Sequence, residues 1–123
     1  MATIAVIDDL YDNAELLKIM LQSACHTDED IKYFSSGRDF LAAVGSQSFH
    51  LVLLDLSMPE MDGFEVLKRL REIDSAVPVI AVTAHAYTWD RKRAMQHGFS
   101  DYVTKPIMDV KGFCSLVDHY LKT

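Results

Sequence analysis

Short apolar runs that are continuous rather than alternating constrain the fold of this chain most. They stand at Thr3–Ile7, Ile31–Phe34, Leu51–Leu54, Val77–Val82 and Tyr102–Val103, and most are rich in valine, isoleucine and leucine. A continuous run is typical of a parallel strand that is buried on both faces, whereas a strand with one solvated face alternates. The runs therefore predict five parallel strands.

The longer segments between and after these runs carry apolar residues at helical spacing. The separation i, i+3, i+4, i+7 occurs at Leu17, Met20, Leu21 and Ala24, and the clearest stripe spans residues 110–121. Shorter stripes lie at 40–44 and 64–73, and a polar fourth helix over 91–97 is closed by Gly98. Strands that alternate with single helices predict an α/β fold, a doubly wound (βα)5 parallel sheet with helices on both faces. Because the chain ends with its fifth helix, we expect one domain over residues 1–123 with no output domain.

Composition excludes several classes of function. Half of the residues are hydrophobic and 24% are charged, which is typical of a globular protein. The net charge of 12 − 18 = −6 argues against direct nucleic-acid binding and suits a protein that binds a cation. No apolar segment approaches the roughly 18 residues of a membrane helix, and no signal pattern precedes the first strand. Cys25 and Cys114 form no CxxC motif, so we expect packing thiols in a cytoplasmic protein.

Polar side chains stand where four of the predicted strands end. The first run leads into Asp8-Asp9, the third into Asp55, the fourth into Thr83, and the fifth is followed by Lys105. In an open parallel sheet, ligands bind beyond the carboxyl ends of the strands. We therefore expect three carboxylates, a hydroxyl and an ammonium group on one edge of the sheet.

Three neighbouring carboxylates repel one another unless a cation lies among them. Oxygen ligands alone suit a hard divalent ion, and Mg²⁺ with few protein ligands usually serves a phosphate group. Lys105 offers a point charge to such a phosphate and Thr83 a hydroxyl donor. Asp55, flanked by Mg²⁺ and Lys105, then has the setting of a nucleophile that forms an aspartyl phosphate.

These residues, in this order and at these spacings, resemble the receiver domain of response regulators in two-component signalling. The resemblance covers essentially the whole chain and rests on Asp8-Asp9, the stretch DLSMPEMDG from Asp55, Thr83-Ala84 and Lys105-Pro106. The chain is similar to the single-domain chemotaxis regulators of that family. The resemblance implies the flavodoxin-like strand order 2-1-3-4-5.

The resemblance also implies a role for each site residue. Asp55 is expected to be the phosphoacceptor, with Asp9, Asp55 and the backbone carbonyl of Ser57 binding Mg²⁺ directly and Asp8 acting through a coordinated water. Lys105 is expected to pair with Asp55 at rest and with the phosphoryl oxygens afterwards.

Four further residues receive roles from the resemblance alone. Thr83 is expected to move toward the phosphoryl group, and Tyr102 to turn inward as Thr83 moves. Ser57 and His85 flank the phosphoryl position and are expected to tune how long the group lasts. The peptide bond before Pro106 is expected to be cis.

The function implied is a phosphorylation-dependent signalling switch. The donor is a phosphohistidine on a sensor histidine kinase or a phosphotransfer protein, and the receiver catalyses its own phosphorylation and dephosphorylation. The downstream protein target stays open. The surface expected to change comprises the fourth helix, the fifth strand and the fifth helix, including Arg91, Lys92, Arg93, Tyr102 and Lys111.

Other interpretations fit less of the sequence. Asp8-Asp9 alone would be the start of a polar loop, with Asp9 or Asp12 capping the next helix. A phosphatase with an aspartate nucleophile needs a second aspartate at position 57, which holds Ser57. A receiver-like domain that has lost phosphorylation usually lacks one of the residues matching Asp55, Asp9 or Lys105, and all three are present here. Nucleotide binding is disfavoured because the sequence contains no glycine-rich phosphate-binding motif.

Overall fold

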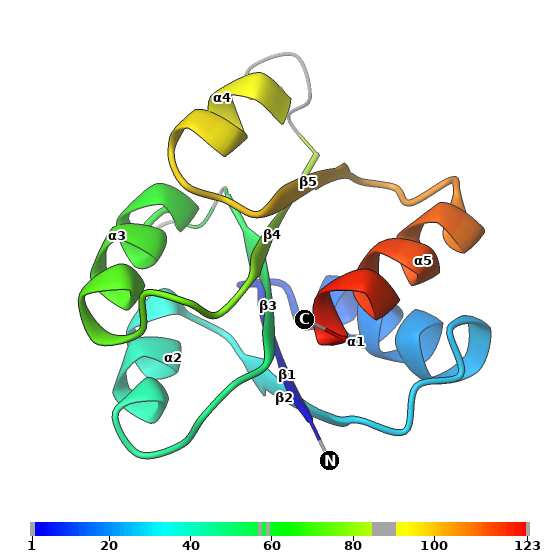
Figure 1. Cartoon of the computed structure of the whole chain (residues 1–123), viewed down its shortest axis with the longest axis horizontal. Coiled ribbons are helices and arrows are strands. Elements are labelled where there is room, and N and C mark those ends of the chain that lie inside the picture. Colours follow the sequence, from blue (N-terminus) through cyan, green and yellow to red (C-terminus); the bar gives the residue numbers. More distant parts are fainter. Residues whose placement is uncertain (1, 57, 59, 85–90, 123) are drawn as a thin grey trace.

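A computed structural model describes residues 2–56, 58, 60–84 and 91–122 of the chain. Strands and helices alternate along it, as Figure 1 shows. The strands are β1 (Thr3–Ile7), β2 (Asp30–Phe34), β3 (Leu51–Asp55), β4 (Val79–Thr83) and β5 (Asp101–Thr104). The helices are α1 (Tyr11–Ile19), its π-helical continuation η1 (Met20–Ala24), α2 (Gly37–Val44), α3 (Gly63–Ile73), α4 (Arg91–Gln96) and α5 (Val110–Leu121).

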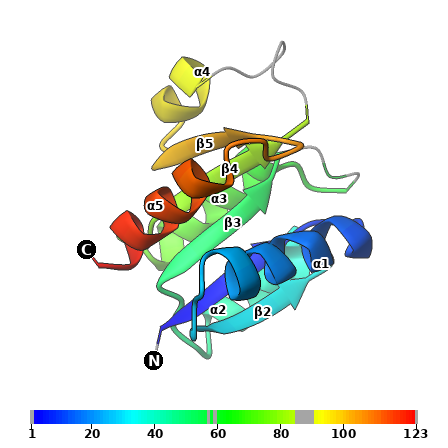
Figure 2. The same ribbon diagram turned by 90° about the vertical axis from the view of Figure 1, so that its right-hand side faces the viewer.

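The five strands form one parallel sheet in the order β2-β1-β3-β4-β5. This confirms the (βα)5 prediction and the strand order that the resemblance implied. Figures 1 and 2 show α1 and α5 on one face of the sheet and α2 and α3 on the other. None of the helices within the described ranges is long and apolar enough to cross a membrane.

The continuous apolar runs follow from a core on both faces of the sheet. In β1, Ile4 and Val6 join a buried cluster with residues of α1 and α5, whereas Ala5 and Ile7 join a cluster with residues of α2, α3 and α4. Because successive side chains of a strand point to opposite faces, a strand covered on both faces needs apolar residues at every position.

Short polar side chains and one glycine define the ends of several helices. Ser36, Asp62 and Asp109 are the N-caps of α2, α3 and α5, and each side chain accepts a hydrogen bond from the backbone N–H three residues later. Gly98 follows α4 with φ of 104°, a left-handed conformation that favours glycine, as the sequence predicts for the end of that helix.

The predicted boundaries of the first strand match the structure, and those of the other four strands differ by one or two residues at one or both ends. The fourth strand begins at Val79 rather than Val77, because Pro78 precedes it and has no N–H to donate. The first helix ends in a π-helical turn, which its regular apolar spacing did not indicate. These local differences leave the order and type of every predicted element unchanged.

The expectation that Cys25 and Cys114 are separate packing thiols is wrong. The two residues form a disulfide bond with their Cα atoms 5.0 Å apart, although 89 positions separate them in sequence. Cys25 follows η1 and Cys114 lies in α5, and these two helices pack on the same face of the sheet. The crossover topology therefore brings the first and last helices together, which sequence separation alone did not reveal.

Candidate functional site

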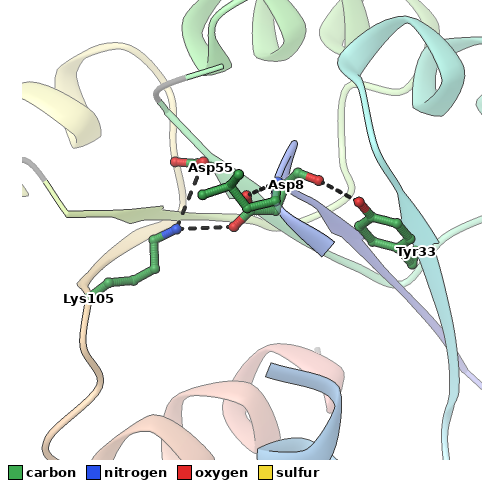
Figure 3. A network of polar contacts seen from close by, with 5 residues as sticks. Asp8, Tyr33, Asp55 and Lys105 are labelled. Carbon is green, nitrogen blue, oxygen red and sulfur yellow. Dashed lines mark hydrogen bonds and ion pairs between the residues drawn. The ribbon is translucent and has the colours of Figure 1, made fainter. Parts of the chain in front are cut away.

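The predicted site residues meet at the carboxyl edge of the sheet. Asp8 and Asp9 follow β1, Asp55 ends β3, Thr83 ends β4 and Lys105 follows β5. The parallel register brings these ends level, since Ile7 pairs with Leu54, Asp55 with Val82 and Thr83 with Thr104. Figure 3 shows Lys105 reaching across this edge toward Asp8 and Asp55.

Asp8, Asp9 and Asp55 form a compact acidic cluster. One carboxylate oxygen from each residue lies within 4.8 Å of the other two. Asp8 is 2% and Asp55 7% exposed, whereas Asp9 is half-buried. Carboxylates gathered and desolvated in this way are costly unless positive charge compensates them.

Lys105 supplies part of that positive charge. Its Nζ lies 3.1 Å from Oδ2 of Asp8, within hydrogen-bond distance, and 3.8 Å from Oδ2 of Asp55. The Lys105 side chain is 18% exposed, so both ion pairs are screened less by solvent than surface pairs are. The expected contact with Asp55 is present, but the shorter contact is to Asp8. One ammonium group facing three carboxylates leaves an excess of negative charge, which suits a divalent cation.

Asp8 is held in place by its own loop and by a residue that the sequence did not single out. Its Oδ1 accepts a hydrogen bond from the Leu10 N–H at 2.9 Å, and its backbone carbonyl accepts one from the Tyr33 hydroxyl at 3.0 Å (Figure 3). Burial, followed by the charges of Asp8 and Asp9, raises the pKa of Tyr33. Tyr33 therefore stays a protonated donor at neutral pH.

The interpretation of Asp9 as a simple helix cap fails. The N-cap position of α1 is Leu10, and no side chain caps that helix end by a hydrogen bond. The Asp9 carboxylate instead belongs to the acidic cluster.

Thr83 and Tyr102 lie on the two neighbouring strands at this side of the sheet. Thr83 is fully buried, and its carbonyl accepts a hydrogen bond of 2.8 Å from the Lys105 N–H. Tyr102 is half-buried and packs against the cluster shared with α2, α3 and α4. The Lys105–Pro106 peptide bond is cis, which confirms that expectation. Ser57 and His85, the two residues expected to tune the phosphoryl lifetime, lie outside the described residues.

A third buried carboxylate, Asp101, lies outside the acidic cluster and was missed by the sequence analysis. It begins β5 and is 4% exposed. Its Oδ1 lies 2.8 Å from Nη2 of Arg91 in α4, and its Oδ2 accepts a hydrogen bond of 3.3 Å from the hydroxyl of Tyr120 in α5. Burial and the Asp101 charge raise the pKa of Tyr120. Asp101 thus joins α4, β5 and α5. The sequence indicated only an acidic residue next to a predicted strand, and it did not indicate the partners, which are distant in sequence.

Comparison with known proteins gives the family. The sequence profile of the response regulator receiver domain matches residues 4–116. A relative from Leptolyngbya boryana, named an uncharacterized 14.6 kDa protein in the sodA1 3′ region, is 37% identical over 121 residues, which cover 95% of this chain and 88% of the relative. The chain spans only 6% to 24% of seven further curated relatives, which include histidine kinases and response regulators.

Two solved structures share the fold over nearly their whole length. The BeF3-activated receiver domain of DrrB is 28% identical, with a TM-score of 0.84, and the match covers 100% of this chain and 99% of that one. The receiver domain of sensor histidine kinase PA1611 from Pseudomonas aeruginosa PAO1, which has a magnesium ion in its active site cleft, is 22% identical with a TM-score of 0.84, and the match covers 99% and 98%. The chain belongs to the response-regulator receiver domains, the phosphorylation-dependent signalling switches of two-component systems.

Proposed function

We propose that this receiver domain accepts a phosphoryl group on Asp55 from a phosphohistidine donor and thereby controls a partner protein. The observation that carries the proposal is the joint placement of Asp8, Asp9 and Asp55 within 4.8 Å, with the Lys105 ammonium group in contact with two of them. Among the clustered carboxylates, Asp55 alone ends a central strand and pairs with Lys105 at the longer distance of 3.8 Å.

A magnesium ion fits the donor set of this cluster. Carboxylate oxygens are the ligands that Mg²⁺ takes in proteins, and it keeps several waters beside one or two carboxylates. Asp9 and Asp55 would hold the ion directly, Asp8 would act through a coordinated water, and the backbone carbonyl of Ser57 would complete the protein ligands. When bound, the ion neutralises charge on the phosphoryl oxygens.

The proposed reaction is a phosphoryl transfer to a carboxylate. An Asp55 oxygen attacks the phosphorus, the bond from phosphorus to the donor breaks, and the donor leaves with the electron pair of that bond. Lys105 and the Thr83 hydroxyl stabilise the negative phosphoryl oxygens as charge moves. In the later hydrolysis, water attacks the phosphorus, the bond from phosphorus to the Asp55 oxygen breaks, and the Asp55 carboxylate leaves with the electron pair of that bond. Inorganic phosphate is released, so the receiver also ends its own signal.

The proposed output is a population shift of one surface of the domain. When Thr83 engages the phosphoryl group, Tyr102 turns inward and favours the active arrangement. The surface comprises α4, β5 and α5, where Arg91, Lys92, Arg93 and Lys111 are exposed. Because Arg91 is paired with buried Asp101, a movement of α4 must rearrange that ion pair.

The proposed partners follow from this chemistry. A sensor histidine kinase or a phosphotransfer protein supplies the phosphoryl group, and a protein target binds the changed surface. We further propose that residues 1–123 act as one receiver domain in the cytoplasm. We do not expect the chain to bind nucleic acid directly, since it carries a net charge of −6.

The test is the intact mass of the native chain after incubation with acetyl phosphate, a small acyl phosphate that serves as donor. With Mg²⁺, we expect a gain of one phosphoryl group per chain, which hydroxylamine then removes because it cleaves acyl phosphates. With a chelator in place of Mg²⁺, the gain should fall at least about tenfold. A gain that needs no divalent cation, or one that resists hydroxylamine, would exclude the proposed aspartyl phosphate.

A further inference from the structure

The Cys25–Cys114 disulfide joins two helices that are otherwise held by side-chain packing. Cys25 is the C-cap residue of η1, and Cys114 is the fifth residue of α5. Figures 1 and 2 show α5 beside the first helix, and the bond closes a separation of 89 positions. The disulfide therefore ties the first half of α5 to the end of the first helix.

The core of the molecule does not depend on this bond. Phe113 and Val117 of α5 are buried in a cluster with Ile4, Leu21 and Leu53, and a second buried cluster covers the other face of the sheet. The far end of α5 has its own attachment, because the Tyr120 hydroxyl donates a hydrogen bond of 2.7 Å to the Ser100 carbonyl. A domain of this size is ordinarily stable without a cross-link. The folded chain can therefore exist with the sulfurs bonded or reduced.

The two cysteines lie outside the fully buried part of the core. Both residues are half-buried, and neither belongs to the fully buried members of the two core clusters, although Cys25 packs against one of them. The residue after Cys25, His26, has φ of 53°, so the chain leaves the helix there by a sharp left-handed turn. The end of a helix at a turn is a place where the backbone adjusts locally while the sheet stays intact.

We propose that Cys25 and Cys114 are a reversible redox modification site, which thiol–disulfide exchange opens and closes in the folded chain. The co-reactant is a low-molecular-weight disulfide, such as oxidised glutathione, and its reduced thiol. The bonded state holds α5 firmly against η1, and the reduced state leaves α5 held by its apolar face and by Tyr120. The site is separate from the acidic cluster and needs no phosphorylation.

The exchange balances in two steps. The thiolate of one cysteine attacks glutathione disulfide, which gives a mixed disulfide and releases one glutathione thiolate. The thiolate of the second cysteine then attacks the protein sulfur of the mixed disulfide and releases the second glutathione. The two cysteines lose two electrons and two protons in total, and glutathione disulfide gains both. Excess reduced thiol reverses the same steps.

The first test counts free thiols in the native chain. The chain is equilibrated with glutathione at a series of reduced-to-oxidised ratios, quenched with acid, alkylated and weighed intact. We expect one transition from two alkyl groups to none as the oxidised fraction rises, and in the matched control Cys25→Ser a glutathione adduct in place of the internal bond. Two free thiols under excess oxidised glutathione would overturn the proposal. So would a bond that excess reduced thiol opens only after urea has unfolded the chain.

The second test measures what the bond does to the folded domain. Closing a separation of 89 positions restricts the unfolded chain, so the oxidised form should melt on the order of 10 °C above the reduced form. The variant Cys25→Ser/Cys114→Ser should have the same melting temperature as the reduced native chain, and dithiothreitol should not change that temperature. Hydrogen exchange in α5 should be faster in the reduced form. Equal melting and exchange for the two forms, or an unfolded reduced chain, would contradict the proposal.

Discussion

An Asp55→Asn chain is expected to take up no phosphoryl group from acetyl phosphate in the presence of Mg²⁺. The amide has nearly the same shape as the carboxylate, so the fold should persist, but a neutral amide lacks the nucleophilic oxygen that the reaction requires. The substitution also removes one of three clustered carboxylates, and Mg²⁺ affinity should fall by about tenfold or more. Intact mass reports the first effect, and calorimetric titration with Mg²⁺ reports the second.

The matched control is Glu60→Gln, which removes a carboxylate near the site but outside the acidic cluster. Glu60 is exposed and lines a cavity of about 220 Å³ with Asp9. This variant should be phosphorylated at the native rate to within about twofold, because an exposed charge outside the acidic cluster is screened by water and salt. Phosphorylation of Asp55→Asn at the native level would exclude Asp55 as the acceptor, provided that circular dichroism shows both variants folded.

Gly63→Ala is expected to lower the free energy of unfolding by roughly 3 kcal/mol, because it overpacks the end of β3. A Cβ atom at position 63 would lie 2.8 Å from the carbonyl oxygen of Asp55 and 2.9 Å from the Cα of Leu56. These are backbone atoms, which cannot move aside as a flexible side chain does. The strand end that carries Asp55 must therefore shift, and phosphorylation should slow as well. Urea denaturation measures the stability.

Gly45→Ala is the matched control for that substitution. Gly45 follows α2 with φ of −67°, and an added Cβ would meet only the Ala42 carbonyl oxygen at 3.8 Å. This change should be neutral or stabilising by up to about 1 kcal/mol, since alanine restricts the unfolded chain. If both glycine variants had the same stability, close packing of Gly63 against the β3 end would not be the reason for the glycine there.

The arrangement of the main site residues was predictable because, in this fold, the end of each strand determines where the residue after it lies. Once the apolar runs are identified as parallel strands, their carboxyl ends must meet at one edge. Asp8, Asp55, Thr83 and Lys105 each end or directly follow a strand, so the topology alone gathers them. The strand order came from the resemblance, since apolar runs of similar composition do not specify their neighbours.

Contacts between distant segments were less predictable. The shorter contact of Lys105 with Asp8 than with Asp55 depends on side-chain conformation at the edge of the sheet. The hydrogen bond of Tyr33 to the Asp8 carbonyl depends on the register between β2 and β1, in which Tyr33 pairs with Val6. The Cys25–Cys114 bond required knowing that the first and last helices share a face and that η1 ends level with the first turns of α5.

Asp101 illustrates the same limit for electrostatics. In the sequence, Asp101 is a polar residue just before a short apolar run. In the structure it is buried and contacts one residue of α4 and one of α5. Its partners, Arg91 and Tyr120, lie 10 and 19 positions away, and each residue is unremarkable alone. Only the packed structure shows that one carboxylate connects α4, β5 and α5.

The position of the phosphoryl group is the most direct test of the account. The native chain, phosphorylated with acetyl phosphate and Mg²⁺, is treated with borohydride, which reduces an acyl phosphate to an alcohol and so marks the modified residue as homoserine. Peptide sequencing by mass spectrometry then finds the mark. We predict homoserine at position 55 alone. Homoserine at position 8 or 9, or a phosphoryl group that survives reduction on a histidine or serine, would contradict the assignment of Asp55 as the phosphoacceptor.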